Sequence, residues 1–300
     1  MIEFFGKRLQ GLKAALHNHC TTSDGKFTPD EIIKLYAEEG FDVFAFTDHR
    51  KSNPVSTYDS HGMTLISGME LHPQGPRGIL WHLVALDVPE DFQWIDQEAQ
   101  ACIDHAVNQG AVVFCAHPHW CGFTAEEVAT LKNISGIEVY NSSCRHIGRA
   151  YNMQLWDELM DKIGPVNAIA VDDTHRPWEL FHGWTVICAR DNTVPAIMEA
   201  LRSGSFYASQ GPQFTKINFR NGLFEAEFTP CTEVIGVATP SGGYMVCEED
   251  VQGPRTGVTP VTSCSLQLRQ REIPTWFRLQ IKDANGHYAW TNPVLVPPLQ

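Results

Sequence analysis

The sequence predicts an α/β domain followed by a small all-β domain. From about residue 12 to residue 210, short apolar runs alternate with amphipathic stretches, as expected of βα units repeated around a parallel sheet. After about residue 211, strand-like runs are separated by turn sequences, which is typical of antiparallel strands. The chain has 300 residues and is 43% hydrophobic, so it can bury one large core and one small core.

Eight apolar runs in the first region are predicted strands, and this is about the number that a barrel contains. They cover residues 12–16, 43–46, 65–67, 80–86, 112–115, 136–140, 168–171 and 184–189. A closed barrel and a doubly wound open sheet both fit such an alternation.

Four helices are predicted between these strands. The first covers 29–39, because Thr28 is a suitable cap and Glu31 occupies the capping-box position. The others cover 95–108, 148–163 and 193–202, and a glycine stands shortly after each of them.

The second region is predicted to form an antiparallel, sandwich-like domain. Its strands cover 214–219, 223–228, 265–268, 277–281 and 288–291, with turns at Asn221-Gly222, 241–243 and Asn285-Gly286. We place the boundary near Gly211-Pro212, which gives domains 1–211 and 212–300. Trp276 and Trp290 are interpreted as core residues more readily than as a ligand platform. This domain is expected to cover the barrel or to build a dimer contact.

Composition and charge exclude several classes of protein. The net charge of −13 argues against duplex nucleic acid as a partner, because phosphate-binding surfaces need clustered Lys and Arg. No apolar run has membrane-spanning length and no signal peptide is recognisable, so we expect a soluble, cytoplasmic protein. Reduced, buried thiols are expected because the nine cysteines form no C-x-x-C pair: Cys20, Cys102, Cys115, Cys121, Cys144, Cys188, Cys231, Cys247 and Cys264.

Residues that can bind metal ions follow most of the predicted strands of the first region. They are His17 and His19 after 12–16, His49 after 43–46, Glu70 after 65–67, His117 after 112–115, and Asp173 and His175 after 168–171, with Asp24 in a loop and His82 near the start of 80–86. In a parallel barrel the C-terminal strand ends meet on one face. A His-x-His pair on an extended segment directs both rings to one side. Each residue alone is more simply a loop, cap or core residue, but the set predicts a metal site.

The motifs resemble those of the PHP superfamily of metal-dependent phosphoesterases. In the family's order the sequence contains His17-Asn18-His19, Ser23-Asp24-Gly25, Thr47-Asp48-His49, Gly68-Met69-Glu70, Ala116-His117-Pro118 and Asp173-Thr174-His175. The segment 281–293 is similar to the end of two-domain PHP proteins of the CehA/McbA metallohydrolase type.

This resemblance implies a distorted (β/α)7 barrel that holds two or three divalent ions. It assigns His17, His19, Glu70 and Asp173 to one ion, Glu70, His82 and His117 to a second, and Asp24, His49 and His175 to a third. Mixed imidazole and carboxylate ligands suit zinc, manganese and iron alike. Asp172 stands where the family often has a small residue, and it is expected to support a ligand or to be an alternative ligand.

The leading hypothesis is hydrolysis of a small, anionic phosphate ester by a water that the metal ions activate. Asp48 is a candidate to orient His49 or a water, and His146 is a candidate proton donor to the leaving group. Lys51, Arg145 and Arg176 are candidates to bind phosphate oxygens. His119 and Asn141 are expected to line the pocket.

Two other hypotheses stay open. The same ions could act on the carbonyl of an ester, amide or carbamate. The site could instead be structural in a non-enzymatic binding module, although it offers more ligands than one four-coordinate zinc needs. A homo-oligomer is compatible with the sequence. Five histidines have no motif around them and are interpreted as structural or surface residues: His61, His72, His105, His182 and His287.

Overall fold

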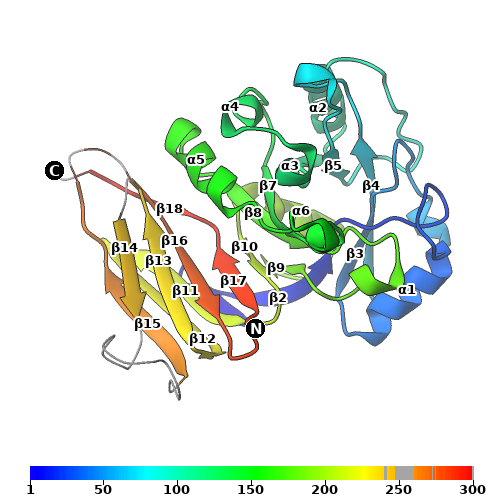
Figure 1. Ribbon diagram of the computed structural model, residues 1–300. Helices are drawn as coiled ribbons and strands as arrows, with labels where there is room; N and C mark the ends of the chain where they lie inside the picture. The colour runs from blue at the N-terminus through cyan, green and yellow to red at the C-terminus, as the bar shows by residue number, and fades with distance from the viewer. Residues whose placement is uncertain (240–241, 247–259, 272, 274, 299–300) are drawn as a thin grey trace.

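The computed structural model describes residues 1–239, 242–246, 260–271, 273 and 275–298, which form a mixed α/β protein (Figure 1). Eight strands of the first region follow one another in sheet order, each paired with the next up to β8. They are β2 (Lys7–Ala15), β3 (Val43–Phe46), β4 (Thr64–Leu71), β5 (Leu83–Leu86), β6 (Val112–Cys115), β7 (Gly136–Asn141), β8 (Asn167–Val171) and β9 (Trp184–Ala189). β9 pairs with β2, and it is linked to β8 because the Thr185 hydroxyl bonds both backbone groups of Ala170.

The expectation of a purely parallel sheet is wrong for two of these strands. β5 runs antiparallel to β4 and β6, and β9 runs antiparallel to β2 and to β10 (Phe206–Ser209). The connection from β4 to β5 contains only the short 3₁₀ helix η2 (Pro76–Gly78), whereas a parallel pair needs a longer crossover, usually a helix. The start of β5 therefore lies at the same edge as the ends of β4 and β6.

The helices lie on the outside of these strands. They are α1 (Pro29–Glu38), α2 (Ala99–Asn108), the short α3 (Pro118–Cys121) and α4 (Ala125–Val128), α5 (Met153–Ile163) and α6 (Val194–Ser203), with 3₁₀ turns η1 (Val55–Thr57), η3 (Ser143–Ile147) and η4 (Pro177–Glu179). The Thr28–Glu31 capping box is confirmed. The helix predicted over 148–163 begins later, because Gly148 adopts a φ of +73° that no helix continues through. The helix predicted over 95–108 begins at Ala99, after an extended Glu98.

All described elements after α6 are strands. β11 (Phe214–Arg220), β12 (Leu223–Cys231) and β15 (Val261–Gln267) form one antiparallel set. β14 (Gly242–Val246), β13 (Glu233–Ala238) and β16 (Thr275–Lys282) form another, with β17 (Tyr288–Thr291) and β18 (Val294–Val296) paired to β16. The predicted turn Asn221-Gly222 joins β11 to β12 with positive φ at both residues. The predicted turn 241–243 begins outside the described residues.

The two regions are connected through their strands. β1 (Ile2–Phe4) pairs antiparallel with β2 and parallel with β11, and β10 pairs with both β9 and β17. Trp276 and Trp290 are buried, as expected of core residues, and they belong to a cluster that includes residues of α5. Figure 1 shows the C-terminal strands against the side of the α/β part from which α5 projects.

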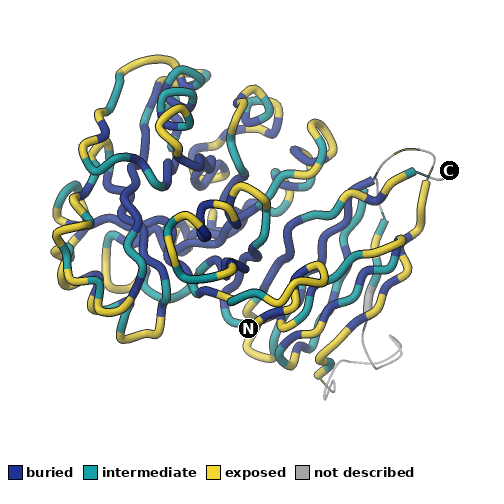
Figure 2. Tube along the Cα trace, turned by 180° about the vertical axis from the view of Figure 1, so that it is seen from behind, coloured by how far each residue is buried: buried dark blue, intermediate teal, exposed yellow. Residues whose placement is uncertain are grey.

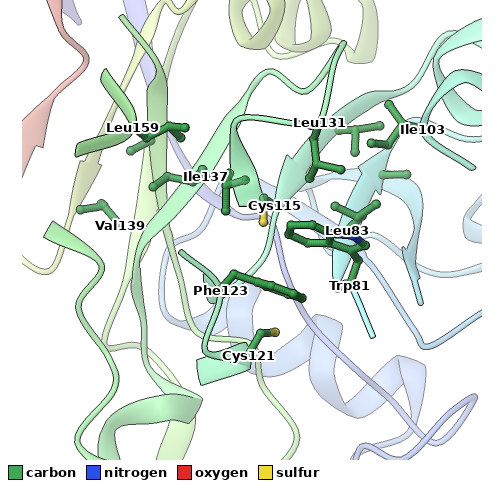
Figure 3. Close-up of a cluster of buried hydrophobic side chains, with 14 of the residues drawn as sticks. Trp81, Leu83, Ile103, Cys115, Cys121, Phe123, Leu131, Ile137, Val139 and Leu159 are labelled. Carbon is green, nitrogen blue, oxygen red and sulfur yellow. The ribbon is translucent and has the colours of Figure 1, made fainter. Parts of the chain in front are cut away.

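The core fixes the segments that carry the site. Figure 2 shows the central strands largely buried beneath more exposed helices and loops. Trp81 stacks on Phe123 with ring centroids 3.8 Å apart, and Figure 3 shows the two side by side. Because His82 directly follows Trp81, this packing anchors the backbone of His82 before β5 begins.

Eight described cysteines are free and buried, as predicted, and Cys247 lies outside the described residues. No helix within the described ranges has both the length and the apolarity needed to cross a bilayer.

Candidate metal centre

Backbone pairing brings the predicted ligand segments to one edge of the strands. The segment after β2 is bonded to the segment after β8, because the Asp173 N–H donates to the His17 carbonyl and the His19 N–H donates to the Thr174 carbonyl. The segment after β3 is bridged to β4 between His49 and Glu70. Residues distant in the sequence therefore converge, as predicted.

Four buried side chains form the first group. His17 Nε2 lies 3.1 Å from His19 Nε2 and 3.3 Å from Asp173 Oδ1. His19 Nε2 lies 3.1 Å from Asp173 Oδ1, and both imidazole nitrogens lie 3.5 Å from Glu70 Oε2. Tetrahedral zinc with bonds of about 2.0–2.2 Å places its ligands roughly 3.3–3.6 Å apart. Glu70 Oε2 and Asp173 Oδ1 have no hydrogen-bond partner in the described structure, so these residues fit a divalent cation.

The other oxygen of Glu70 belongs to a second group. Glu70 Oε1 lies 2.7 Å from His82 Nδ1 and 3.3 Å from His117 Nε2. His82 reaches this edge because β5 is antiparallel, so that its start adjoins the ends of β4 and β6. One carboxylate therefore faces two sets of imidazoles, which is the arrangement of a bridging ligand.

A third group lies nearer to solvent. Asp24 Oδ1 is 3.4 Å from His49 Nε2, 3.5 Å from His175 Nε2 and 4.0 Å from His19 Nδ1. The Asp24 side chain is 56% exposed, so this group can receive a ligand from solvent.

Glu138 supports the first two groups, and it was not among the residues predicted from the sequence. This buried β7 residue lies 2.6 Å from His17 Nδ1, and its other oxygen accepts the His117 N–H at 2.8 Å. Asn141, expected to line the pocket, is buried and donates to both Glu138 and Asp173. The sequence offered one indication of this role, because Glu138 is a carboxylate within the apolar run 136–140 and a buried charge needs partners.

His72, interpreted from the sequence as a structural or surface residue, also lies at the centre. Its Nε2 lies 2.9 Å from His49 Nδ1 and 3.4 Å from Glu70 Oε2, and its ring packs against His82. The two-residue spacing Glu70-Leu71-His72 at the end of β4 could have revealed it, by the same alternation that relates His17 to His19.

Asp48 and Lys51 hold the loop that carries Asp24. Asp48 accepts hydrogen bonds from the backbone N–H groups of Cys20 and Ser23, both at 3.0 Å, and from Asn53 at 2.7 Å. The Lys51 ammonium donates to the carbonyl of Thr22 at 2.6 Å. These contacts fix residues 20–24 and do not involve the His49 ring.

Asp172 supports a neighbouring loop. Its carboxylate accepts hydrogen bonds from the Tyr36 hydroxyl and from the backbone N–H groups of Phe181, His182 and Gly183. Burial raises the pKa of Asp172 to about 6 despite these bonds. With both oxygens occupied, Asp172 fits the supporting alternative better than the ligand alternative.

A cavity of about 290 Å³ opens above the ligand groups. Besides predicted ligands from all three groups, it is lined by Trp120, Ser143, Cys144, His146, Ile147 and Arg176. Of the predicted catalytic residues, His146 and Arg176 thus line this cavity. The Arg145 guanidinium donates to the carbonyls of Ser142 and Trp178, and the His119 ring lies 3.2 Å from the Tyr151 carbonyl.

The ionisable groups of the centre perturb one another strongly. Burial would raise the pKa of Asp173, but the charges of His17 and His175 outweigh burial and hold it well below its usual range. Burial lowers the pKa of His19 to about 4. Asp173 and His117 also have positive φ values of 55° and 27°, a strain of about 1–3 kcal/mol that proteins tolerate mainly at functional sites.

Comparison with known proteins gives a structural relationship. No family model and no curated protein sequence matches the chain. A two-domain protein from Bacteroides vulgatus that contains a predicted PHP-like metal-dependent phosphoesterase superposes with a TM-score of 0.57 at 16% identity, covering 96% of this chain and 95% of that one.

Two other structures superpose less well. A protein from Bifidobacterium adolescentis, assigned as a metal-dependent phosphoesterase, gives a TM-score of 0.45 at 13% identity, with 65% of this chain and 97% of that one covered. An amidohydrolase from Chromobacterium violaceum, with bound sulfate and no metal, gives 0.45 at 17% identity over 55% and 88% of the two chains. The chain shares its fold with the two-domain protein from Bacteroides vulgatus.

Proposed function

We propose that the protein is a metal-dependent hydrolase that cleaves a small phosphate ester. The observation that carries this proposal is the Glu70 carboxylate, which directs one oxygen to His17 and His19 and the other to His82 and His117. A carboxylate shared in this way suits two adjacent cations, the arrangement that stabilises both the attacking and the leaving oxygen in phosphoryl transfer.

We assign the ligands by the three groups described above: His17, His19, Glu70 and Asp173; Glu70, His82 and His117; and Asp24, His49 and His175. Two or three ions of zinc, manganese or iron fit these nitrogen and oxygen donors. When bound, such ions supply a Lewis acid and lower the pKa of water from about 16 toward about 7.

The residues around the cavity have distinct proposed tasks. Arg176 binds the phosphate oxygens, and His146 gives a proton to the leaving alcohol. Trp120 and Ile147 contact the body of the substrate and limit its size. Arg145 and His119 meet only a substrate that extends beyond the cavity. Asp48 and Lys51 position Asp24, and Asn141 positions Asp173.

The finer architecture is also part of the proposal. We propose that residues 1–211 form a distorted (β/α)7 barrel and residues 212–300 a sandwich-like domain of the CehA/McbA type. The sheet order from β2 to β8 supports the barrel, and the apolar cluster of β11 to β18 supports the second domain. That cluster also includes Ile2, Phe4, Val186, Cys188 and Tyr207, so the two domains share part of this core.

The test combines metal analysis with activity. Elemental analysis of the purified protein is expected to give two or more transition-metal ions per chain, and an aryl phosphate is expected to be hydrolysed. Chelation should abolish phosphate release, and return of the metal should restore it. If ions are bound but no phosphate is released, and a panel of esters or carbamates is cleaved rapidly, the protein is a hydrolase of carbonyl substrates instead. A single, fully protein-coordinated ion would indicate a structural site.

A further inference from the structure

His72 contacts the candidate metal centre without belonging to its motif set. It follows β4 two residues after Glu70, so both side chains point toward the centre. Its side chain is only 12% exposed, and its ring is held against His82 with centroids 4.1 Å apart. A mostly buried, polar ring in this place needs a hydrogen-bond partner.

That partner is His49. His72 Nε2 lies 2.9 Å from His49 Nδ1, while the opposite nitrogen of His49, Nε2, faces Asp24 Oδ1 at 3.4 Å. His49 is therefore placed between a candidate ion site on one side and the His72 ring on the other.

Two other candidate ligands are held in the same way. The Nδ1 atom of His17 lies 2.6 Å from Glu138, and that of His175 lies 2.9 Å from the Asp173 carbonyl. An acceptor on one ring nitrogen fixes the tautomer and leaves the other nitrogen free for an ion. For His49, the atom that lies where an acceptor is needed, next to Nδ1, is Nε2 of His72.

We propose that His72 is a positioning residue that accepts a hydrogen bond from the Nδ1–H of His49 and so directs His49 Nε2 to the ion held with Asp24 and His175. This inference rests on the proposed metal-dependent function. It concerns the ion of the third group alone, and predicts that the other two sites do not depend on His72.

Glu70 Oε2 is the competing acceptor, since it lies 2.7 Å from His49 Nδ1. The contact does not meet hydrogen-bond geometry, and this oxygen has no hydrogen-bond partner among the described residues. It also stands 3.5 Å from the Nε2 atoms of His17 and His19, at a corner of the first group. When Glu70 Oε2 binds an ion of the first group, it is not available to His49. His72 Nε2 is then the acceptor for the Nδ1–H of His49.

The test compares two substitutions of His72 with one control. His72→Leu removes the acceptor, whereas His72→Gln keeps one in its amide oxygen. His287→Leu, at a half-exposed histidine in the turn between β16 and β17, is the control. Metal-free protein of each kind is titrated with Zn²⁺ against a chromophoric chelator, which gives the number of ions and the affinity of each.

We expect His72→Leu to bind one ion about 10–100-fold more weakly and the remaining ions unchanged, as for other residues that orient a metal ligand. His72→Gln and His287→Leu should match the wild type. Wild-type affinities in His72→Leu would overturn the inference, and so would equal losses in the Leu and Gln variants. If the wild type itself binds no ion, the proposed function fails instead.

A second measurement needs no substitution of His72. Long-range ¹H–¹⁵N spectra of the zinc-loaded wild type report which nitrogen of each imidazole carries the proton, and the signal of His49 is identified by its loss in His49→Gln. We expect Nδ1–H with Nε2 bound to the ion. A proton on Nε2 would overturn the assignment.

Discussion

Single residues of the centre depend on partners that solvent does not reach. Glu138 is fully buried and accepts from the His17 ring, the His117 N–H and the Asn141 amide. The role of Glu138 therefore depends on the three hydrogen bonds that its carboxylate accepts. Any replacement must offer acceptors at two positions, and a glutamine offers only one.

Glu138→Gln should therefore weaken metal binding without unfolding the protein. The amide group of the introduced glutamine would face a donor, and His17 would lose its ionised partner, so we expect the affinity for zinc to fall about 10–100-fold. Zinc titration against a competing chelator measures this change, with Glu38→Gln on the exposed side of α1 as control. Unchanged affinity in Glu138→Gln would show that the charge is not needed.

Arg176 distinguishes the possible substrates. Among the residues that line the described cavity, Arg176 is the one Arg or Lys. A hydrogen bond to a charged group contributes about 1.5–3 kcal/mol. We expect Arg176→Ala to lower kcat/KM for an aryl phosphate roughly 10–100-fold and to leave neutral ester cleavage unaffected. Arg190→Ala, at a 73% exposed residue away from the cavity, is the control. An equal loss on both substrates would remove Arg176 from phosphate recognition.

The sequence predicted those site residues that stand in recognisable short-range patterns. His17 and His19, or Asp173 and His175, are recognisable from spacing alone. His72 has the same spacing from Glu70, but it was overlooked because the motif recognised there, Gly68-Met69-Glu70, ends at Glu70. Glu138 was hidden because its partners, His17 and His117, lie 121 and 21 residues away.

Among the elements, α5 and β16 are joined by an ion pair between a buried arginine and an aspartate that is 33% exposed. Arg278 is 2% exposed, its guanidinium donates to both oxygens of Asp157, and it lies over the Trp156 ring. Trp276 on the same strand donates to Asp161 of the helix. These contacts attach the C-terminal strands to the α/β part at a fixed place.

Asp157→Ala should destabilise the protein by about 3 kcal/mol, because it leaves the Arg278 charge buried without a partner. Urea unfolding followed by tryptophan fluorescence measures the loss. Glu158→Ala, at the next position of the same helix, should cost less than about 1 kcal/mol. Because alanine is the most favourable residue in a helix, a lower helix propensity cannot explain a loss in either variant, and a similar loss in both would mean that the ion pair does not govern the result.

Local sequence patterns predicted most elements well, and the errors have identifiable causes. The Thr28 capping box and the Asn221-Gly222 turn are confirmed because each acts within four residues. The antiparallel direction of β5 was missed, although no helix was predicted between the strands 65–67 and 80–86, and a parallel pair needs a long crossover. β1 and β10, of three and four residues, were not among the predicted strands.

For the whole molecule, metal removal should lower thermal stability. An ion bound at 100 times its Kd stabilises the folded state by about 2.7 kcal/mol. For a chain of this size we expect a decrease of several degrees in Tm on chelation, roughly 2–4 °C per kcal/mol, with recovery when the metal returns. Scanning calorimetry measures it, and a Glu70→Gln variant, which lacks the shared carboxylate, should respond much less. An identical Tm with and without bound metal would contradict the proposed coupling.

The pairing of β1 with β11 has a consequence for synthesis on the ribosome. Phe4 and its partner Ile217 are separated by most of the α/β part. At about 5–20 residues per second, roughly 10–40 s pass between the emergence of the two. During that interval the apolar side chains of Ile2 and Phe4 lack the cover that β11 gives them, so the nascent chain exposes an apolar strand that a chaperone can shield until β11 emerges.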